Sequence, residues 1–156
     1  MISEPGSSDA LVMDTHIWLW VSGEAGGERM VKPSVAQRVE SAARSRRLFV
    51  SAASVWELAL KASNGRALVS GDLHEWVRAQ TRFPGVRVLP IDSRVAVESG
   101  RLPEWIRKRD GKPHRDPADR FIVTTARLKN AVLLTCDVEI LTFSEDGHLR
   151  ACDARR

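Results

Sequence analysis

The stretch from His114 to Asp137 limits what this chain can fold into more than any other, because it joins a helix start to a buried strand and places acids beside both. Asp116 and Pro117 are typical of a helix start, since Asp caps free N–H groups and Pro suits the first helical position. The unbroken apolar run 131–134 then favours a strand covered on both faces. Asp119 in the helix's first turn and Asp137 after the strand lie where open α/β sheets bind ligands.

Apolar runs that predict strands alternate with helical patterns along the rest of the chain. Strands are expected at 10–13, 48–50, 86–89 and 131–134, and helices at 15–21, 34–47, 55–62, 73–83, 92–97, 116–130 and 138–143. This alternation predicts an α/β fold with a central, mostly parallel, twisted sheet and helices on both faces. Thr15 and Ser34 are expected to cap their helices, and Ser54 with Glu57 forms a capping-box pattern.

The length of 156 residues favours one domain. We expect a flexible N-terminus at 1–9, one folded domain at 10–152 and a basic tail at 153–156. The chain shows no signal-peptide pattern and no apolar run long enough for a membrane span, and its two cysteines form no CxxC pair, so a cytoplasmic location is expected. The net charge of +4 and a pI near 9.6 permit a polyanionic partner without requiring one.

Four acids are distinguished by their positions: Asp14, Glu57, Asp119 and Asp137. Most lie near the carboxyl end of an expected strand, and in a parallel sheet all those ends share one edge. Carboxylates that converge there cannot all stay ionised and unpaired at low cost. Their hard oxygen atoms suit Mg²⁺ or Mn²⁺, which would offset the repulsion.

Helix capping is the competing interpretation of the same acids. Glu57 completes the capping box that begins at Ser54, and Asp119 follows Asp116 at capping distance. Asp14 fits an exposed turn equally well, and Asp137 fits a cap for the helix that follows it. Sequence pattern alone leaves both interpretations open.

Four motifs, in order, resemble those of PIN-domain proteins, specifically the VapC-type toxin of a type II VapBC toxin–antitoxin pair. The matching motifs are LVMDTHIWLW at 11–20, SAASVWELALK at 51–61, DPADRFI at 116–122 and LLTCD at 133–137. The resemblance implies a ribonuclease that uses Mg²⁺ or Mn²⁺, with Asp14, Glu57, Asp119 and Asp137 as catalytic metal ligands. It also implies supporting roles for Asp116 and Thr15.

The same resemblance implies an RNA substrate, a cognate VapB-like antitoxin, a homodimer and a hetero-oligomer with that antitoxin. The basic segment between 105 and 115 supplies candidate RNA-binding residues, although such a run is also typical of a solvated face. These residues are Arg107, Lys108, Arg109, Lys112 and Arg115. Trp105 lies among them and is a candidate for base stacking, whereas core or dimer packing is expected for Trp18, Trp20, Trp56 and Trp76.

The sequence therefore predicts a metal-dependent endoribonuclease that acts as a toxin. The alternative is a non-catalytic RNA-binding or partner-binding module on the same fold. The presence of all four acids counts against the alternative. His114 draws attention because it directly precedes Arg115 and Asp116.

Overall fold

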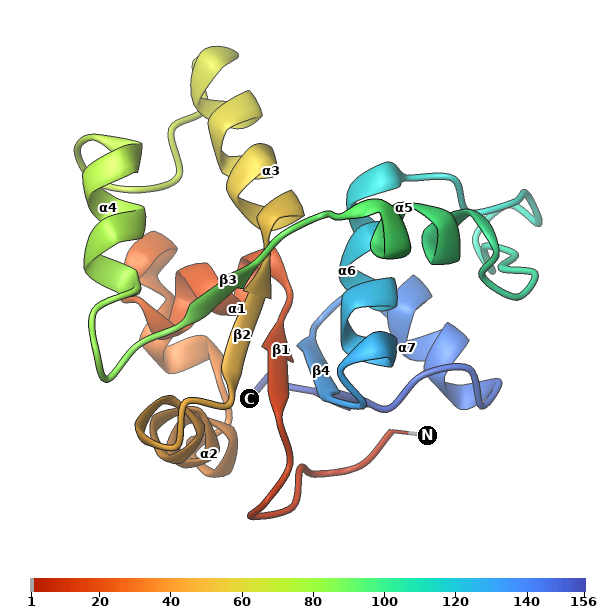
Figure 1. Cartoon of the computed structure of the whole chain (residues 1–156), viewed down its shortest axis with the longest axis horizontal. Helices are drawn as coiled ribbons and strands as arrows, with labels where there is room; N and C mark the ends of the chain where they lie inside the picture. The colour runs from red at the N-terminus through yellow and green to blue at the C-terminus, as the bar shows by residue number, and fades with distance from the viewer. Residues whose placement is uncertain (1) are drawn as a thin grey trace.

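The computed structural model describes residues 2–156, apart from the side chain of Glu28, and places one parallel sheet at the centre of the molecule (Figure 1). Its strands follow the order β3-β2-β1-β4-β5, and every neighbouring pair is parallel. The strands are β1 (Leu11–Met13), β2 (Leu48–Ser51), β3 (Arg87–Leu89), β4 (Val132–Thr135) and β5 (Ala151–Asp153). The predicted α/β class and parallel sheet are confirmed.

Helices connect the strands and cover both faces of the sheet. They are α1 (Thr15–Val21), α2 (Pro33–Arg44), α3 (Ala52–Ser63), α4 (Leu73–Gln80), α5 (Ser93–Gly100), α6 (Pro117–Leu128) and α7 (Val138–Glu145), with a 3₁₀ segment η1 (Glu24–Met30) after α1. Among residues 2–156, none of the helices is long and apolar enough to cross a membrane.

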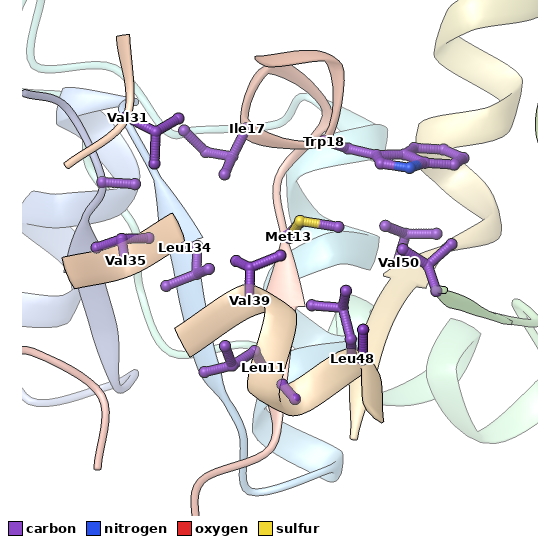
Figure 2. Close-up of a cluster of buried hydrophobic side chains, with 14 of the residues drawn as sticks. Leu11, Met13, Ile17, Trp18, Val31, Val35, Val39, Leu48, Val50 and Leu134 are labelled. Carbon is purple, nitrogen blue, oxygen red and sulfur yellow. The ribbon is translucent and has the colours of Figure 1, made fainter. Parts of the chain in front are cut away.

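Two apolar cores lie on opposite faces of the sheet because successive strand side chains point to opposite faces. Leu11 and Met13 of β1 pack against the first core, which α1 and α2 cover with residues that include Trp18 and Val39 (Figure 2). Val12 belongs to the second core, which α6 and α7 cover. Both faces of β1 are therefore buried, and its carboxyl end is held firmly in the middle of the sheet.

Two of the expected caps are wrong. Asp14, rather than Thr15, caps α1, because its side chain accepts a hydrogen bond from the Thr15 N–H. Ser34 does not cap α2, because that helix already begins at Pro33 and has no side-chain cap. The fixed backbone angle of proline suits the first helical position and starts the helix without one.

The third helix also starts earlier than predicted. Ser51 caps α3 through a 3.0 Å hydrogen bond from the Ala53 N–H, so the expected turn at 51–54 is helical. Ser54 lies inside the helix, and the capping box with Glu57 is wrong. Ser51 precedes Ser54 by nearly one helical turn, and the sequence offers both hydroxyls as caps. The strand ends at the first of them.

β5 was not predicted, and it forms the outer strand beside β4. On the other side of β5, Ile2 bridges to Ala151 and the Ser3 N–H donates a 3.0 Å hydrogen bond to the Ala151 carbonyl. Asp9 forms a 2.7 Å ion pair with Arg150. The expected flexibility at 1–9 and the domain limits stay predictions, and Met1 lies outside the described residues.

Candidate active site

The four candidate acids come from four different parts of the chain. Asp14 directly follows β1, Asp137 follows β4, Glu57 lies in α3 and Asp119 lies in the first turn of α6. Because β1, β2 and β4 are parallel neighbours, their carboxyl ends meet at one edge, and the helices that follow them begin there. The fold therefore places the acids around one edge of the sheet.

Asp14 is a buried carboxylate, with 6% of its surface exposed, so the exposed-turn interpretation is wrong. Its Oδ1 accepts a 2.7 Å hydrogen bond from the Thr15 N–H, and its Oδ2 accepts one of 2.8 Å from the Thr135 hydroxyl. The pKa of Asp14 is raised to about 7, chiefly by burial; the charges of Asp119 and Glu57 also raise it, whereas the hydrogen bonds from Thr135 and Thr15 lower it. The ionised form of Asp14 is therefore destabilised relative to its protonated form in the metal-free protein.

Glu57 is joined to the Asp14 region through Thr15. The Thr15 hydroxyl donates a 2.6 Å hydrogen bond to Oε1 of Glu57 and lies 2.9 Å from Oγ of Ser54. Burial raises the pKa of Glu57, the Thr15 hydrogen bond lowers it, and the charge of Asp119 raises it again. Thr15 therefore supports Glu57, and the buried hydroxyl of Ser54 supports Thr15.

Asp119 is not a helix cap. Asp116 performs that function by accepting a 3.1 Å hydrogen bond from the Asp119 N–H. The Asp119 side chain instead lies 2.9 Å from His114, between its Oδ2 and Nε2 of the imidazole. Burial raises the pKa of Asp119, His114 lowers it, and the charges of Asp116 and Asp137 raise it.

Asp137 does cap a helix, as one of the two interpretations predicted. Its Oδ1 accepts hydrogen bonds of 2.7 Å and 3.2 Å from the N–H groups of Glu139 and Ile140 at the start of α7. Its own N–H donates a 3.0 Å hydrogen bond to Oγ1 of Thr135. Capping and membership of the acidic group are compatible here, because the charge of Asp137 also acts on Asp119.

Three residues near the acids were missed or undervalued in the sequence: Ser54, Thr135 and His114. Thr135 is the one with a visible signal, because it is a hydroxyl residue at the end of an apolar strand and two positions before an acid. The contacts of Ser54 and His114 depend on the packing of α3 and α6, which no local pattern shows.

A cavity of about 630 Å³ opens beside the acids. Acidic and basic side chains share its wall: Asp116, Asp119, Asp137 and Glu139 face Arg107, Arg109, Lys112, Arg115 and His114, with Pro113 between. The cavity therefore brings most of the expected RNA-binding residues next to two of the four candidate acids.

The basic segment forms a turn closed by a bridge between Ile106 and Pro113. Arg107 forms a 2.7 Å ion pair with Asp110 inside this turn. Lys108 differs from the other basic candidates, since its ammonium lies 3.8 Å from Glu145 and it is not among the residues of the cavity wall. Arg109, Lys112 and Arg115 are the basic residues best placed for an anionic ligand.

The expectation for Trp105 is wrong. Trp105 is 4% exposed and stacks between His114 and Phe143, so its faces are covered. Its basic neighbours suggested a surface residue, but the segment folds back and buries the ring. Core packing is confirmed for Trp18 and Trp76, whereas Trp56 is 52% exposed.

The donor atoms of this site fit a divalent cation. They are hard carboxylate oxygens, and the pKa values of Asp14, Glu57 and Asp119 are raised first by burial and then by the like charges of neighbouring acids. Within residues 2–156, however, no group of three or more His, Cys, Asp or Glu side chains is arranged closely enough to hold a metal ion.

The parallel sheet and its edge of acids define a class of α/β domain, and comparison with known families identifies it. The model of the PIN domain family matches residues 11–145, and the chain therefore belongs to the PIN domain family. A comparison with curated proteins found no match.

Solved structures of toxin–antitoxin complexes have a similar fold. VapBC2 from Rickettsia felis, bound to a promoter DNA fragment, has 13% identity and a TM-score of 0.58 over 94% of this chain and 98% of that chain. FitAcB from Neisseria gonorrhoeae has 22% identity and a TM-score of 0.59 over 92% and 96%. VapBC-1 from nontypeable Haemophilus influenzae has 24% identity and a TM-score of 0.58 over 92% and 96%. At these identities the likeness establishes the fold.

Proposed function

We propose that this chain is a metal-dependent endoribonuclease that acts as the toxin of a toxin–antitoxin pair. The observation that carries the proposal is that four acids from four parts of the chain lie around one edge of the parallel sheet. The charge of Asp119 acts on Asp14 and Glu57, and that of Asp137 acts on Asp119. Membership of the PIN domain family supports the same function.

Asp14, Glu57, Asp119 and Asp137 are the proposed ligands of Mg²⁺ or Mn²⁺. When bound, such an ion would supply positive charge to the phosphodiester and make water a better nucleophile. Thr15 and Thr135 hold the carboxylates of Glu57 and Asp14 in place. A carboxylate with a raised pKa, as at Asp119 on the cavity wall, is suited to accept a proton from the attacking water.

The proposed substrate is RNA, held by basic side chains on the cavity wall. Arg109, Lys112 and Arg115 would neutralise backbone phosphates next to the acids. Arg107 belongs to the same wall, although its guanidinium is already paired with Asp110. Lys108 is proposed as an outer contact.

The proposed partner is a VapB-like antitoxin, in a hetero-oligomer built on a toxin homodimer in the cytoplasm. The fold likeness to VapBC and FitAB structures supports this proposal. An antitoxin arginine would pair with the carboxylates, because its planar group can bind them at two points. Trp56 and Leu60, one turn apart on the exposed side of α3, offer apolar surface to the same partner, whereas Trp18 is fully buried and cannot.

The test is cleavage of labelled RNA by the purified chain in Mg²⁺ and in EDTA. The wild type should cleave only in Mg²⁺, and Asp14→Asn should lose cleavage while it stays folded. Asp72→Asn is the matched control, because it makes the same change at an exposed cap of α4, where Asn caps equally well. RNA binding without cleavage by the wild type would instead support the non-catalytic binding module.

A further inference from the structure

His114 is a buried residue beside the acids, and its ring is fixed by stacking. It is 6% exposed. The imidazole stacks on Trp105 with ring centroids 4.1 Å apart and planes 17° apart, and Trp105 stacks in turn on Phe143 at 4.5 Å. At the far end of this row, His148 packs on Phe143 at 4.9 Å. The row sets the plane of the His114 ring independently of Asp119.

The backbone of His114 is held as well. Its N–H donates a 2.7 Å hydrogen bond to the Trp105 carbonyl. Its carbonyl accepts one of 3.0 Å from Nη1 of Arg120, whose Nη2 donates one of 2.7 Å to the Ser99 carbonyl. His114 is therefore a rigid support, with both its ring and its backbone attached to the surrounding structure.

The two ring nitrogens have different environments. Nε2 lies 2.9 Å from Oδ2 of Asp119, whereas Nδ1 is buried and has no hydrogen-bond partner among residues 2–156. When Asp119 is ionised its carboxylate only accepts hydrogen bonds, so in that state Nε2 is the nitrogen that carries the proton between the two side chains. A buried nitrogen without a partner lowers stability. The ring orientation thus gives Nε2 a contact with Asp119 and leaves Nδ1 without a hydrogen bond.

We propose that His114 is a positioning residue that holds the carboxylate of Asp119 on the cavity wall and so sets the affinity of the site for a divalent cation. The inference rests on the proposed function, because it requires Asp119 to be a metal ligand. Groups that hold a metal ligand in place commonly change metal affinity 10–100-fold when they are removed. His114 is such a group, because its Nε2 lies 2.9 Å from Oδ2 of Asp119, the proposed metal ligand.

Two variants separate the hydrogen bond from the stacking. His114→Phe keeps an aromatic ring against Trp105 and removes the donor. His114→Gln loses the ring and keeps an N–H donor near the position of Nε2. His148→Phe is the matched control, because it makes the same change at the other end of the same aromatic row.

Two measurements apply to each variant: Mn²⁺ binding, from the EPR signal of the free ion, and the Mg²⁺ concentration that gives half-maximal RNA cleavage. His114→Phe should weaken Mn²⁺ binding about tenfold or more and raise the Mg²⁺ midpoint by a similar factor. His114→Gln should recover much of this loss, and His148→Phe should match the wild type. Wild-type affinity in His114→Phe, or equal losses in His114→Phe and His114→Gln, would overturn the proposal.

The result also separates this inference from the proposed function. If the wild type neither binds Mn²⁺ nor cleaves RNA with Mg²⁺, the proposed function fails and the inference fails with it. If the wild type does both and His114→Phe behaves identically, the inference alone fails. Side-chain ¹⁵N NMR of His114 in the wild type gives a test that does not depend on the folding of a variant. The expected result is a proton on Nε2 and none on Nδ1. A proton on Nδ1 and none on Nε2 would contradict the proposal.

Discussion

The Thr135 hydroxyl at the end of β4 donates a 2.8 Å hydrogen bond to Oδ2 of Asp14 at the end of β1, across 121 positions of sequence. The same Oγ1 accepts a 3.0 Å hydrogen bond from the Asp137 N–H. One buried hydroxyl therefore joins two of the candidate acids, and it does so at the junction of two adjacent parallel strands.

Thr135→Val should lower the free energy of unfolding by about 1–3 kcal/mol, because it leaves a buried carboxylate oxygen and a backbone N–H without partners. Thr124→Val is the matched control: Thr124 is equally buried, but its hydroxyl has no hydrogen-bond partner among the described residues, so the change should be nearly neutral or stabilising. Urea unfolding of the three proteins checks this prediction. Equal losses in both variants would show that the Thr135 hydroxyl has no special importance.

Asp14 should make the metal-free protein less stable as the pH rises from about 4 to 7. Its pKa is about 7 in the folded state against 3.8 ordinarily, so in this window the folded protein keeps a proton that the unfolded chain has released. Stability is then highest below the unfolded pKa and falls with a slope approaching about 1.4 kcal/mol per pH unit. Urea midpoints in EDTA should decline more steeply for the wild type than for Asp14→Asn, with Asp72→Asn following the wild type. Parallel profiles for the wild type and Asp14→Asn would contradict the raised pKa.

Asp119→Asn should stabilise the metal-free protein, because it removes one of several like charges while an amide oxygen can still accept the His114 hydrogen bond. A gain of roughly 1 kcal/mol is expected at an effective dielectric well above that of dry protein, or about 2–4 °C in melting temperature. Mg²⁺ should raise the melting temperature of the wild type and raise that of Asp119→Asn much less.

Thermal melting in EDTA and in excess Mg²⁺ measures both effects. A lower melting temperature for Asp119→Asn in EDTA, together with equal responses to Mg²⁺, would leave the metal-site interpretation without its electrostatic basis. The structure already excludes one simple reason for such a loss, since Asp116 rather than Asp119 caps α6.

Replacing Arg109, Lys112 and Arg115 by Gln should weaken RNA binding and reduce its dependence on salt, because all three line the cavity. For three lost phosphate contacts on a single strand, the log–log slope should fall by about 2. Binding is measured at several salt concentrations in the Asp14→Asn background, which is expected not to cleave. Lys108→Gln is the comparison, because Lys108 is not among the lining residues, and losing this single proposed outer contact should lower the slope by no more than about 0.7. An unchanged slope in the triple variant would place the RNA elsewhere.

The central strands and the edge of acids could be predicted from the sequence because both depend on short-range patterns. The apolar runs before Asp14 and Asp137 are buried on both faces in the structure, as unbroken runs predict. Once the sheet is parallel, the carboxyl ends of its strands must meet. The meeting of these two acids at one edge followed from that geometry.

Features that depend on tertiary packing could not be predicted in this way. β5 has only three residues, Ala151–Asp153, and such a short segment shows no periodicity. Trp105 is buried by a turn that folds back on α7, although its neighbours in sequence are charged. The contact of His114 with Asp119 requires that same turn to return to the start of α6.

The central position of β1 has a consequence for synthesis of the protein. Translation produces Asp14 early, but β1 needs β4 as a neighbour, and the Thr135 that holds Asp14 comes late in the chain. A nascent chain that has not reached residue 135 carries Asp14 and Glu57 without Thr135 or Asp137. If the site cleaves RNA as proposed, it cannot assemble while most of the polypeptide is being made, because the strand that carries Thr135 is made late. The order of the strands therefore prevents the unfinished chain from cleaving the messenger or the ribosome that makes it.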